Sequence, residues 1–297
     1  MFILLLTCSA VAYALQNTLI AAACRRNDVL AVVTWRGLSL AVLMVPLLCW
    51  ADVSAFARLG AHLLPLAGAC CAGASANLFG SLAVRHLSVG IANAVFMSVS
   101  TVATALFAIL FHDERPSAWE FVGMGVIIGC VVLLTLSSRR RTRPVATTAG
   151  GVAIGVVCAC MFGLLISTAV TCLLTVTREV DPFIAAWAWE GGIGAVALVF
   201  LLLRRGLRRA AVVTLSARET GLLALAVAPT AVGTGCYTVG TAHPGSSLAV
   251  AGAMLGTIMI FSAVFARLVY GERLTREQWL AVAGACAAIV LFQLTSA

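Results

Sequence analysis

Arg36 and Glu190 are charged side chains inside otherwise apolar segments, and each follows a tryptophan and precedes a glycine. Both lie about six to eight residues into their segments, or roughly 9–12 Å along a helix. A charge at that depth is costly in hydrocarbon, so it indicates a function. Glu190 could take up a proton, or the two side chains could pair in one conformation and separate in another. The sequence leaves open a structural role, in which Arg36 extends to lipid headgroups and Glu190 caps a backbone.

Uncharged polar side chains form a second group of candidates. Asn93, Met97 and Ser100 are spaced four and three residues apart, so they share one helix face. Amides and hydroxyls can hold the polar ends of a small amphipathic or zwitterionic solute, while methionine and aromatic side chains adapt to the rest. The alternative for any one of them is a hydrogen bond between helices. The candidate substrate-binding residues are Tyr13, Gln16, Asn17, Asn77, Phe79, Asn93, Met97, Ser100, Tyr237, Ser247 and Met254.

The composition indicates that a membrane surrounds these residues. The chain has 297 residues, of which 62% are hydrophobic and 10% are charged, against about 25% charged in a soluble domain. The charges fall in short clusters between apolar runs, and each run is long enough for a spanning helix of roughly 20 residues. The net charge is +8, but the arginines flank apolar runs, where they meet headgroups, so we expect no nucleic-acid partner.

We expect an all-α membrane protein with ten transmembrane helices in two sets of five. The first five are predicted at about 2–23, 29–50, 62–83, 87–111 and 118–137. The second five are predicted at about 149–175, 182–203, 218–240, 245–269 and 277–295. The first repeat is then 1–138, the second is 149–297, and a basic linker at 139–148 joins them.

The two halves repeat each other. The Trp-Arg-Gly triplet around Arg36 returns as Trp-Glu-Gly around Glu190, and the stretch 114–117 returns at 272–275, each time before an apolar segment. Five is an odd number, so the second half must enter the membrane from the opposite side, and a two-fold axis in the membrane plane relates the halves. A central cavity between inverted copies can face either side in turn. Because of the inversion, Arg36 and Glu190 could also lie at opposite faces and never meet.

The arginines predict an orientation of the chain. If the N-terminus were cytoplasmic, Arg58, Arg115 and Arg178 would be the cytoplasmic loop arginines, and nearly all the others would lie outside. Cytoplasmic loops normally carry the excess of basic residues. The arginine distribution therefore favours both termini outside.

The motifs for other chemistry are missing from the sequence. The 11 cysteines lie mostly within apolar runs, where they read as small hydrophobic residues. No Cys/His set has the spacing of a metal site, and no phosphate-binding loop is present. We therefore expect no metal, no cofactor and no enzymatic activity.

The ten-span plan, the paired Glu-Arg-x-Ser/Thr turns and the charged residue after each tryptophan resemble the drug/metabolite transporter superfamily, in its duplicated EamA-type branch. The resemblance covers essentially the whole chain. It implies a fold in which the fourth and ninth helices cross near the centre and the first, third, sixth and eighth complete a cavity. It also implies secondary transport, often export of amino acids, other metabolites or toxic compounds.

The chain departs from that family in three respects. Gln16-Asn17 stands in the first helix where members often have Trp-Gly, and Val99-Ser100-Thr101 stands where a proline is common in the fourth. Members usually have cytoplasmic termini, which disagrees with the arginine distribution.

We therefore expect a secondary active transporter of the bacterial plasma membrane that works by alternating access, as a monomer or a homodimer. The expected activity is export of an amino acid or related metabolite. A multidrug or cation exporter is the alternative within transport, with Glu190 as the intramembrane carboxylate. A lipid flippase or a membrane scaffold is the alternative from another class.

Overall fold

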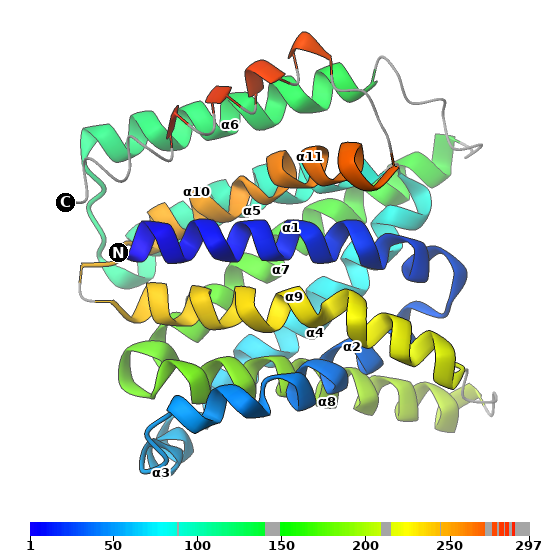
Figure 1. Cartoon of the computed structure of the whole chain (residues 1–297), viewed down its shortest axis with the longest axis vertical. Coiled ribbons are helices and arrows are strands. Elements are labelled where there is room, and N and C mark those ends of the chain that lie inside the picture. The colour runs from blue at the N-terminus through cyan, green and yellow to red at the C-terminus, as the bar shows by residue number, and fades with distance from the viewer. Residues whose placement is uncertain are drawn as a thin grey trace.

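The computed structural model describes the chain at 1–87, 89–139, 149–208, 215–243, 245–270, 275–277, 279–281, 283–284 and 287–288. All regular structure in these residues is helical, and the long helices lie side by side (Figure 1). The first half contains α1 (Phe2–Arg26), α2 (Val29–Leu43), η1 (Val45–Trp50), α3 (Ala55–Leu59), η2 (Gly60–His62), α4 (Leu63–His86), α5 (Val89–His112) and α6 (Ala118–Arg139). The second half contains α7 (Ala149–Glu179), α8 (Pro182–Arg208), α9 (Ala217–Ala242), α10 (Leu248–Gly256) and α11 (Ile258–Tyr270).

Most of the predicted spans are helices that can cross a membrane. Seven described stretches are long and apolar enough: Phe2–Arg26, Val29–Trp50, Ala55–His86, Val95–His112, Gly150–Glu179, Pro182–Gly206 and Ala217–Ala242. Two shorter apolar helices, Phe121–Cys130 and Leu248–Ser262, fall within the fifth and ninth predicted spans. The prediction of an all-α membrane protein is confirmed. The tenth predicted span, 277–295, and most of the linker lie outside the described residues, so the count of ten stays a prediction.

Two predicted spans are interrupted rather than continuous. The second is α-helical only to Leu43 and continues as the 3₁₀ helix η1, which has Pro46 in its first turn. Proline lacks the N–H that an α-helix needs and clashes with the preceding turn. The ninth is divided at Thr257, whose hydroxyl donates to the carbonyl of Met254 at 2.6 Å. Such a back-bond competes with the helical pattern and bends the helix.

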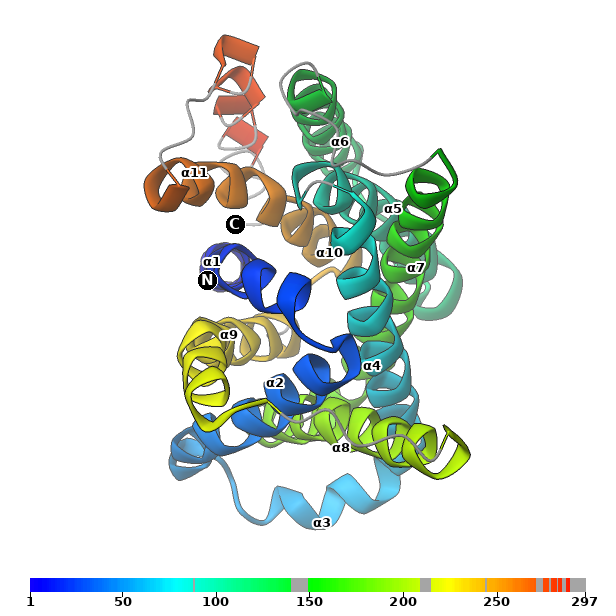
Figure 2. The ribbon, with the colours of Figure 1, turned by 90° about the vertical axis from the view of Figure 1, so that its right-hand side faces the viewer.

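Equivalent helices of the two halves make equivalent packing contacts. α4 packs on α7 as α9 packs on α1, and α4 packs on α8 as α9 packs on α2. α2 also packs on α8, and α5 on α10, each helix with its counterpart from the other half. Figure 2 shows α2 and α8 next to each other at one end of the molecule and α6 at the other. This pairing is the one expected of two inverted copies.

Carboxylates tie both ends of the α2–α8 pair. Asp28 caps α2 by accepting from the N–H groups of its first turn, and it accepts two hydrogen bonds from Arg204 at the end of α8, at 2.9 and 3.1 Å. At the other end Asp181 caps α8 and accepts from the backbone N–H of Asp52 at 3.2 Å. The start of each helix therefore meets the end of the other, and the two run antiparallel.

Candidate functional site

A cavity lies between the two halves of the chain. The space that the centres of water molecules can reach in it is about 140 Å³. One water itself fills roughly 10–15 Å³, so the cavity has room for several waters or a small solute. Helices of both halves line it: α1, α2, α4 and α5 from the first, and α7, α8, α9, α10 and α11 from the second. A site that belongs to both halves is the kind that their relative movement can open.

Arg36 and Glu190 meet at this cavity. Nη1 of Arg36 lies 3.2 Å from Oε2 of Glu190, and both residues line the space. Arg36 is 6% exposed and Glu190 is 1% exposed. The antiparallel packing of α2 and α8 places the two equivalent residues opposite each other. In this conformation Arg36 does not extend to headgroups, and the possibility that the two residues never meet is wrong.

Glu190 is held by a second chain of hydrogen bonds. Thr234 Oγ1 lies 2.8 Å from Glu190 Oε1 and also 2.8 Å from the hydroxyl of Tyr13. A carboxylate only accepts, so the threonine hydrogen points to Glu190 and Tyr13 must donate to Thr234. Tyr13 itself lines the cavity. Both carboxylate oxygens of Glu190 therefore have hydrogen-bond partners, and the hydroxyl groups of Thr234 and Tyr13 link it to α9 and α1.

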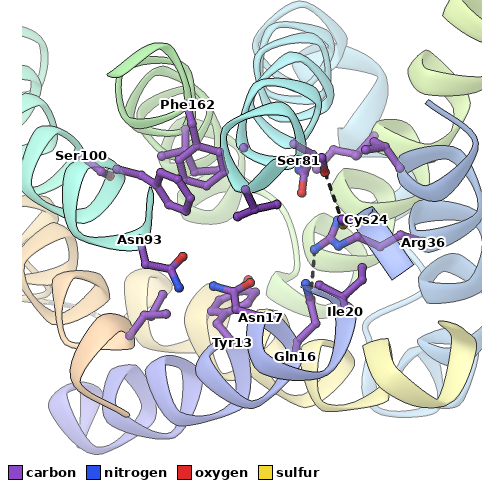
Figure 3. A pocket seen from close by; sticks show the side chains of 18 of the residues that line it. Tyr13, Gln16, Asn17, Ile20, Cys24, Arg36, Ser81, Asn93, Ser100 and Phe162 are labelled. Carbon is purple, nitrogen blue, oxygen red and sulfur yellow. Dashed lines mark hydrogen bonds between the residues drawn. The ribbon is translucent and has the colours of Figure 1, made fainter. Parts of the chain in front are cut away.

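Gln16 holds the other side of Arg36. Its amide oxygen accepts from Arg36 Nη2 at 3.3 Å (Figure 3). The same oxygen also accepts from the hydroxyl of Thr230. The ion pair thus belongs to a buried network that joins α1, α2, α8 and α9. A buried network with most of its members satisfied holds a charge pair in one geometry.

The EamA-like transporter family matches this chain at residues 1–136 and again at 153–294. The chain belongs to this family. The double match agrees with the duplication, and the protein is a multi-pass membrane transporter. A solved crystal structure with 14% sequence identity superposes with a TM-score of 0.72, covering 97% of this chain and 96% of the other. At that identity the likeness concerns the fold alone.

Shorter matches connect this EamA-like transporter with drug-resistance proteins. Quaternary ammonium compound-resistance protein QacF of Klebsiella aerogenes is 41% identical over 61 residues, which are 20% of this chain and 56% of the relative. A putative ethidium bromide resistance protein of Escherichia coli is 37% identical over 65 residues, 22% of this chain and 56% of the relative. The matches span about half the length of these relatives.

The structure brings most of the predicted site residues of this transporter to one cavity. In Figure 3, Asn93 of α5 points toward the face of α1 that carries Tyr13 and Asn17. Asn77 lines the same space, and its amide nitrogen donates to the carbonyl of Gly73 one turn earlier at 2.8 Å. The candidates that line the cavity are Tyr13, Gln16, Asn17, Arg36, Asn77, Asn93, Met97, Ser100, Glu190 and Tyr237.

Three candidates lie elsewhere. Phe79 is half-buried and packs against the hydrophobic core, and Met254 is fully buried inside α10. Ser247 stands before the first turn of α10, where its hydroxyl donates to Glu114 at 3.0 Å and accepts from the N–H of Val250. None of the three is among the cavity-lining residues. These residues were predicted from their side-chain types alone. Side-chain type does not show whether a residue lies on the cavity face of its helix or on another face.

Sequence reasoning missed several residues of the site. Thr230 and Thr234 were not predicted, although their spacing of four residues puts both hydroxyls on one face of α9. Phe96 and Phe162 line the cavity with their ring centroids 4.4 Å apart, but phenylalanine in an apolar run carries no distinguishing signal. Trp189 lines it as well and was visible only as the neighbour of Glu190.

A metal centre is not indicated. Among the residues that the structure describes, no group of three or more His, Cys, Asp or Glu side chains could hold a metal ion. The polar groups of the cavity-lining residues include amides, hydroxyls, an indole N–H and the Arg36–Glu190 ion pair. Such groups bind organic solutes through hydrogen bonds and charge.

Proposed function

We propose that this EamA-like transporter is a secondary active exporter of a small zwitterionic solute, such as an amino acid or a related metabolite. The observation that carries the proposal is the buried ion pair of Arg36 and Glu190 at the cavity. A zwitterion presents one charge of each sign, so its carboxylate can bind Arg36 while its ammonium group binds Glu190. When the solute replaces the contact between Arg36 and Glu190, each side chain still has a counter-charge. A buried charge without one would cost several kcal/mol.

Glu190 is the proposed coupling residue, with Arg36 as its gate. Protonation of Glu190 removes the negative charge that the ammonium group of the solute binds, so a proton displaces the solute from the site. Loss of the proton restores the carboxylate, which then pairs with Arg36 or with the ammonium group of the next solute. The position of Glu190 at the cavity supports this role, because a proton and a solute can both reach it there. A proton and a solute that compete for one site are thereby exchanged across the membrane by alternating access.

Export of organic cations is the second candidate. It is favoured by the names of the partial relatives, which are resistance proteins for quaternary ammonium compounds and ethidium bromide. The aromatic side chains Phe96, Phe162 and Trp189 line the cavity and could face a cation through cation–π interactions. An organic cation without a carboxylate would, however, be repelled by the positive charge of Arg36. We therefore propose a zwitterion as the substrate ahead of a cation.

Counterflow in proteoliposomes tests the proposal. Vesicles containing the purified protein are preloaded in turn with amino acids, nucleosides or organic cations, and uptake of the labelled solute is measured between pH 6 and pH 8. Exchange of amino acids that loses its pH dependence in Glu190→Gln would support both parts of the proposal. Exchange of organic cations alone would favour the second candidate. Exchange of no solute would favour a lipid flippase or a membrane scaffold.

The chain is placed in the bacterial plasma membrane by this proposal. The arginine distribution favours termini on the outer side, whereas the family resemblance favours cytoplasmic termini. A fluorescent protein that folds only in the cytoplasm, fused after Ala297, distinguishes the two. Strong fluorescence would contradict the orientation derived from the arginines.

A further inference from the structure

Five buried polar side-chain atoms in the described part of the chain have no hydrogen-bond partner. They are Ser9 Oγ, Arg36 Nε, His112 Nε2, Trp189 Nε1 and the hydroxyl of Tyr237. Arg36, Trp189 and Tyr237 line the cavity, and the other two residues do not. The three are 6%, 4% and 2% exposed, so bulk water does not cover these groups.

All three unpartnered groups can donate a hydrogen bond. The Nε–H of arginine and the indole N–H of tryptophan can only donate a hydrogen bond, and a tyrosine hydroxyl can donate as well. Nη1 and Nη2 of Arg36 each have a partner, Glu190 and Gln16, whereas Nε has none. Buried donors are normally paired because an unpaired one is costly. A ligand that satisfies this cavity must therefore bring acceptor oxygens.

We infer that the open donors of Arg36, Trp189 and Tyr237 form an acceptor-binding subsite that selects solutes bearing a carboxylate over amines that lack one. The inference rests on the proposed transport function and names the residues that would select its substrate class. Phe96 and Phe162 line the same cavity and supply an apolar surface for the remainder of the solute. A quaternary ammonium or aryl-phosphonium cation has no acceptor atom and leaves all the donors unpaired.

Trp189 is the decisive residue of this subsite. Its indole nitrogen would lie 3.2 Å from a Cβ atom placed on Gly73 of α4, so it lies against that glycine. Two residues earlier on α8, the indole nitrogen of Trp187 donates to the carbonyl of Ala41 at 3.0 Å and does not line the cavity. The two tryptophans thus provide a matched pair, one that lines the cavity and has an unpartnered donor and one that lies outside it and has a satisfied donor.

Ligand-induced thermal shifts on the full-length protein in detergent test the inference. The probes are two matched pairs, phenylalanine with 2-phenylethylamine and leucine with 3-methylbutylamine, together with tetraphenylphosphonium. The dissociation constant comes from the rise in unfolding temperature with ligand concentration. Each variant is compared with its own ligand-free state, so a general loss of stability does not affect the result.

We expect an amino acid of these pairs to raise the unfolding temperature and the corresponding amine to bind at least about tenfold more weakly. Trp189→Phe should weaken binding of the amino acid about tenfold, because a hydrogen bond to a charged group is lost. Tyr237→Phe should weaken it in the same direction, and Trp187→Phe should leave it unchanged.

Three results would overturn the inference. They are equal binding of acids and amines, wild-type affinity in both Trp189→Phe and Tyr237→Phe, and the absence of any shift with the acids. The last would mean that the acids do not satisfy the donors. Counterflow separates this outcome from failure of the proposed function. If amines bind and are exchanged but the acids do not, the protein is a transporter and the acceptor-binding subsite is contradicted. If the acids bind but are not exchanged, the subsite is supported and the proposed transport function is contradicted.

Discussion

Gly37 of α2 and Gly194 of α8 are in direct backbone contact. A Cβ atom on Gly37 would lie 2.5 Å from the Cα of Gly194, and one on Gly194 would lie 2.6 Å from the backbone nitrogen of Leu38. Small residues permit this approach of two membrane helices. The contact brings the helix axes close enough for Arg36 and Glu190 to pair across them. The glycine that follows Arg36 in the sequence is therefore part of the site's geometry.

Gly194→Ala is expected to lower the unfolding temperature of the purified protein. The added methyl group meets backbone atoms of α2, which cannot move aside without separating the helices. Overpacking of this kind costs about 1–3 kcal/mol. The matched control is Gly206→Ala in the same helix, where the new Cβ meets no atom within 4 Å. Equal unfolding temperatures for the two variants would contradict the close contact.

Glu190→Leu should destabilise the protein more than the double variant Arg36→Met/Glu190→Leu. The single change leaves a buried guanidinium without its counter-charge, at a cost of about 3–5 kcal/mol. The double change removes both charges and is expected to recover most of that loss. Thermal unfolding in detergent measures stability, and counterflow should show both variants inactive. A double variant as unstable as the single one would show that the unpaired charge of Arg36 is not the cause of the lost stability.

Glu114→Gln should loosen the start of α10. The carboxylate of Glu114 accepts from the N–H groups of Leu248 and Ala249 at 2.8 and 3.2 Å and from the hydroxyl of Ser247, and it lies 3.7 Å from Arg178. A negative charge is favoured at a helix N-terminus. The free energy of opening the first turn of α10 is expected to fall by about 2 kcal/mol, because hydrogen bonds to a charged group are stronger than neutral ones.

Hydrogen exchange of the α10 amides measures the effect of Glu114→Gln directly. Faster exchange at Leu248 and Ala249 is the expected result. Asp113→Asn is the control, because it removes the same charge from an exposed neighbour in the same turn. Similar exchange in both variants would indicate a general charge effect instead of a specific cap.

The Asp28–Arg204 pair predicts an acid-sensitive stability. Burial raises the pKa of Asp28, but hydrogen bonds from Arg204 and the α2 backbone outweigh it, so the pKa lies below its ordinary 3.8. A depressed pKa means that the pair stabilises the fold above the ordinary value. The stabilisation is lost as the pH falls through the folded-state pKa.

Thermal unfolding between pH 6 and pH 3 tests the Asp28–Arg204 prediction. Asp28→Asn, which keeps a good helix cap, and Arg204→Gln should both lower the unfolding temperature at pH 6 and show a smaller decline toward pH 3 than wild type. Arg205→Gln, a change of the same charge at the neighbouring exposed residue, should behave like wild type. A decline in Asp28→Asn as steep as in wild type would contradict the prediction.

The sequence predicted the helical elements well and the faces of the helices poorly. Long apolar runs with charges between them locate spanning helices, because the cost of burying a charge in hydrocarbon is large. The interruptions at Pro46 and Thr257 were not predicted, although a proline and a hydroxyl stand there. Whether such a residue bends a helix or is accommodated depends on its neighbours in space. For the same reason Ser247 and Met254 were predicted at the cavity and lie elsewhere.

By itself the sequence determined that this is an all-helical membrane protein of duplicated design, with charges of opposite sign at equivalent positions. Those properties follow from composition and from the spacing of repeated motifs along the chain. Only the tertiary structure decided that Arg36 and Glu190 pair, and that Gln16, Thr234 and Tyr13 complete their network. The pairing depends on the antiparallel contact of α2 and α8 through Gly37 and Gly194. A contact between residues far apart in the chain depends on how whole helices pack, which local spacing does not specify.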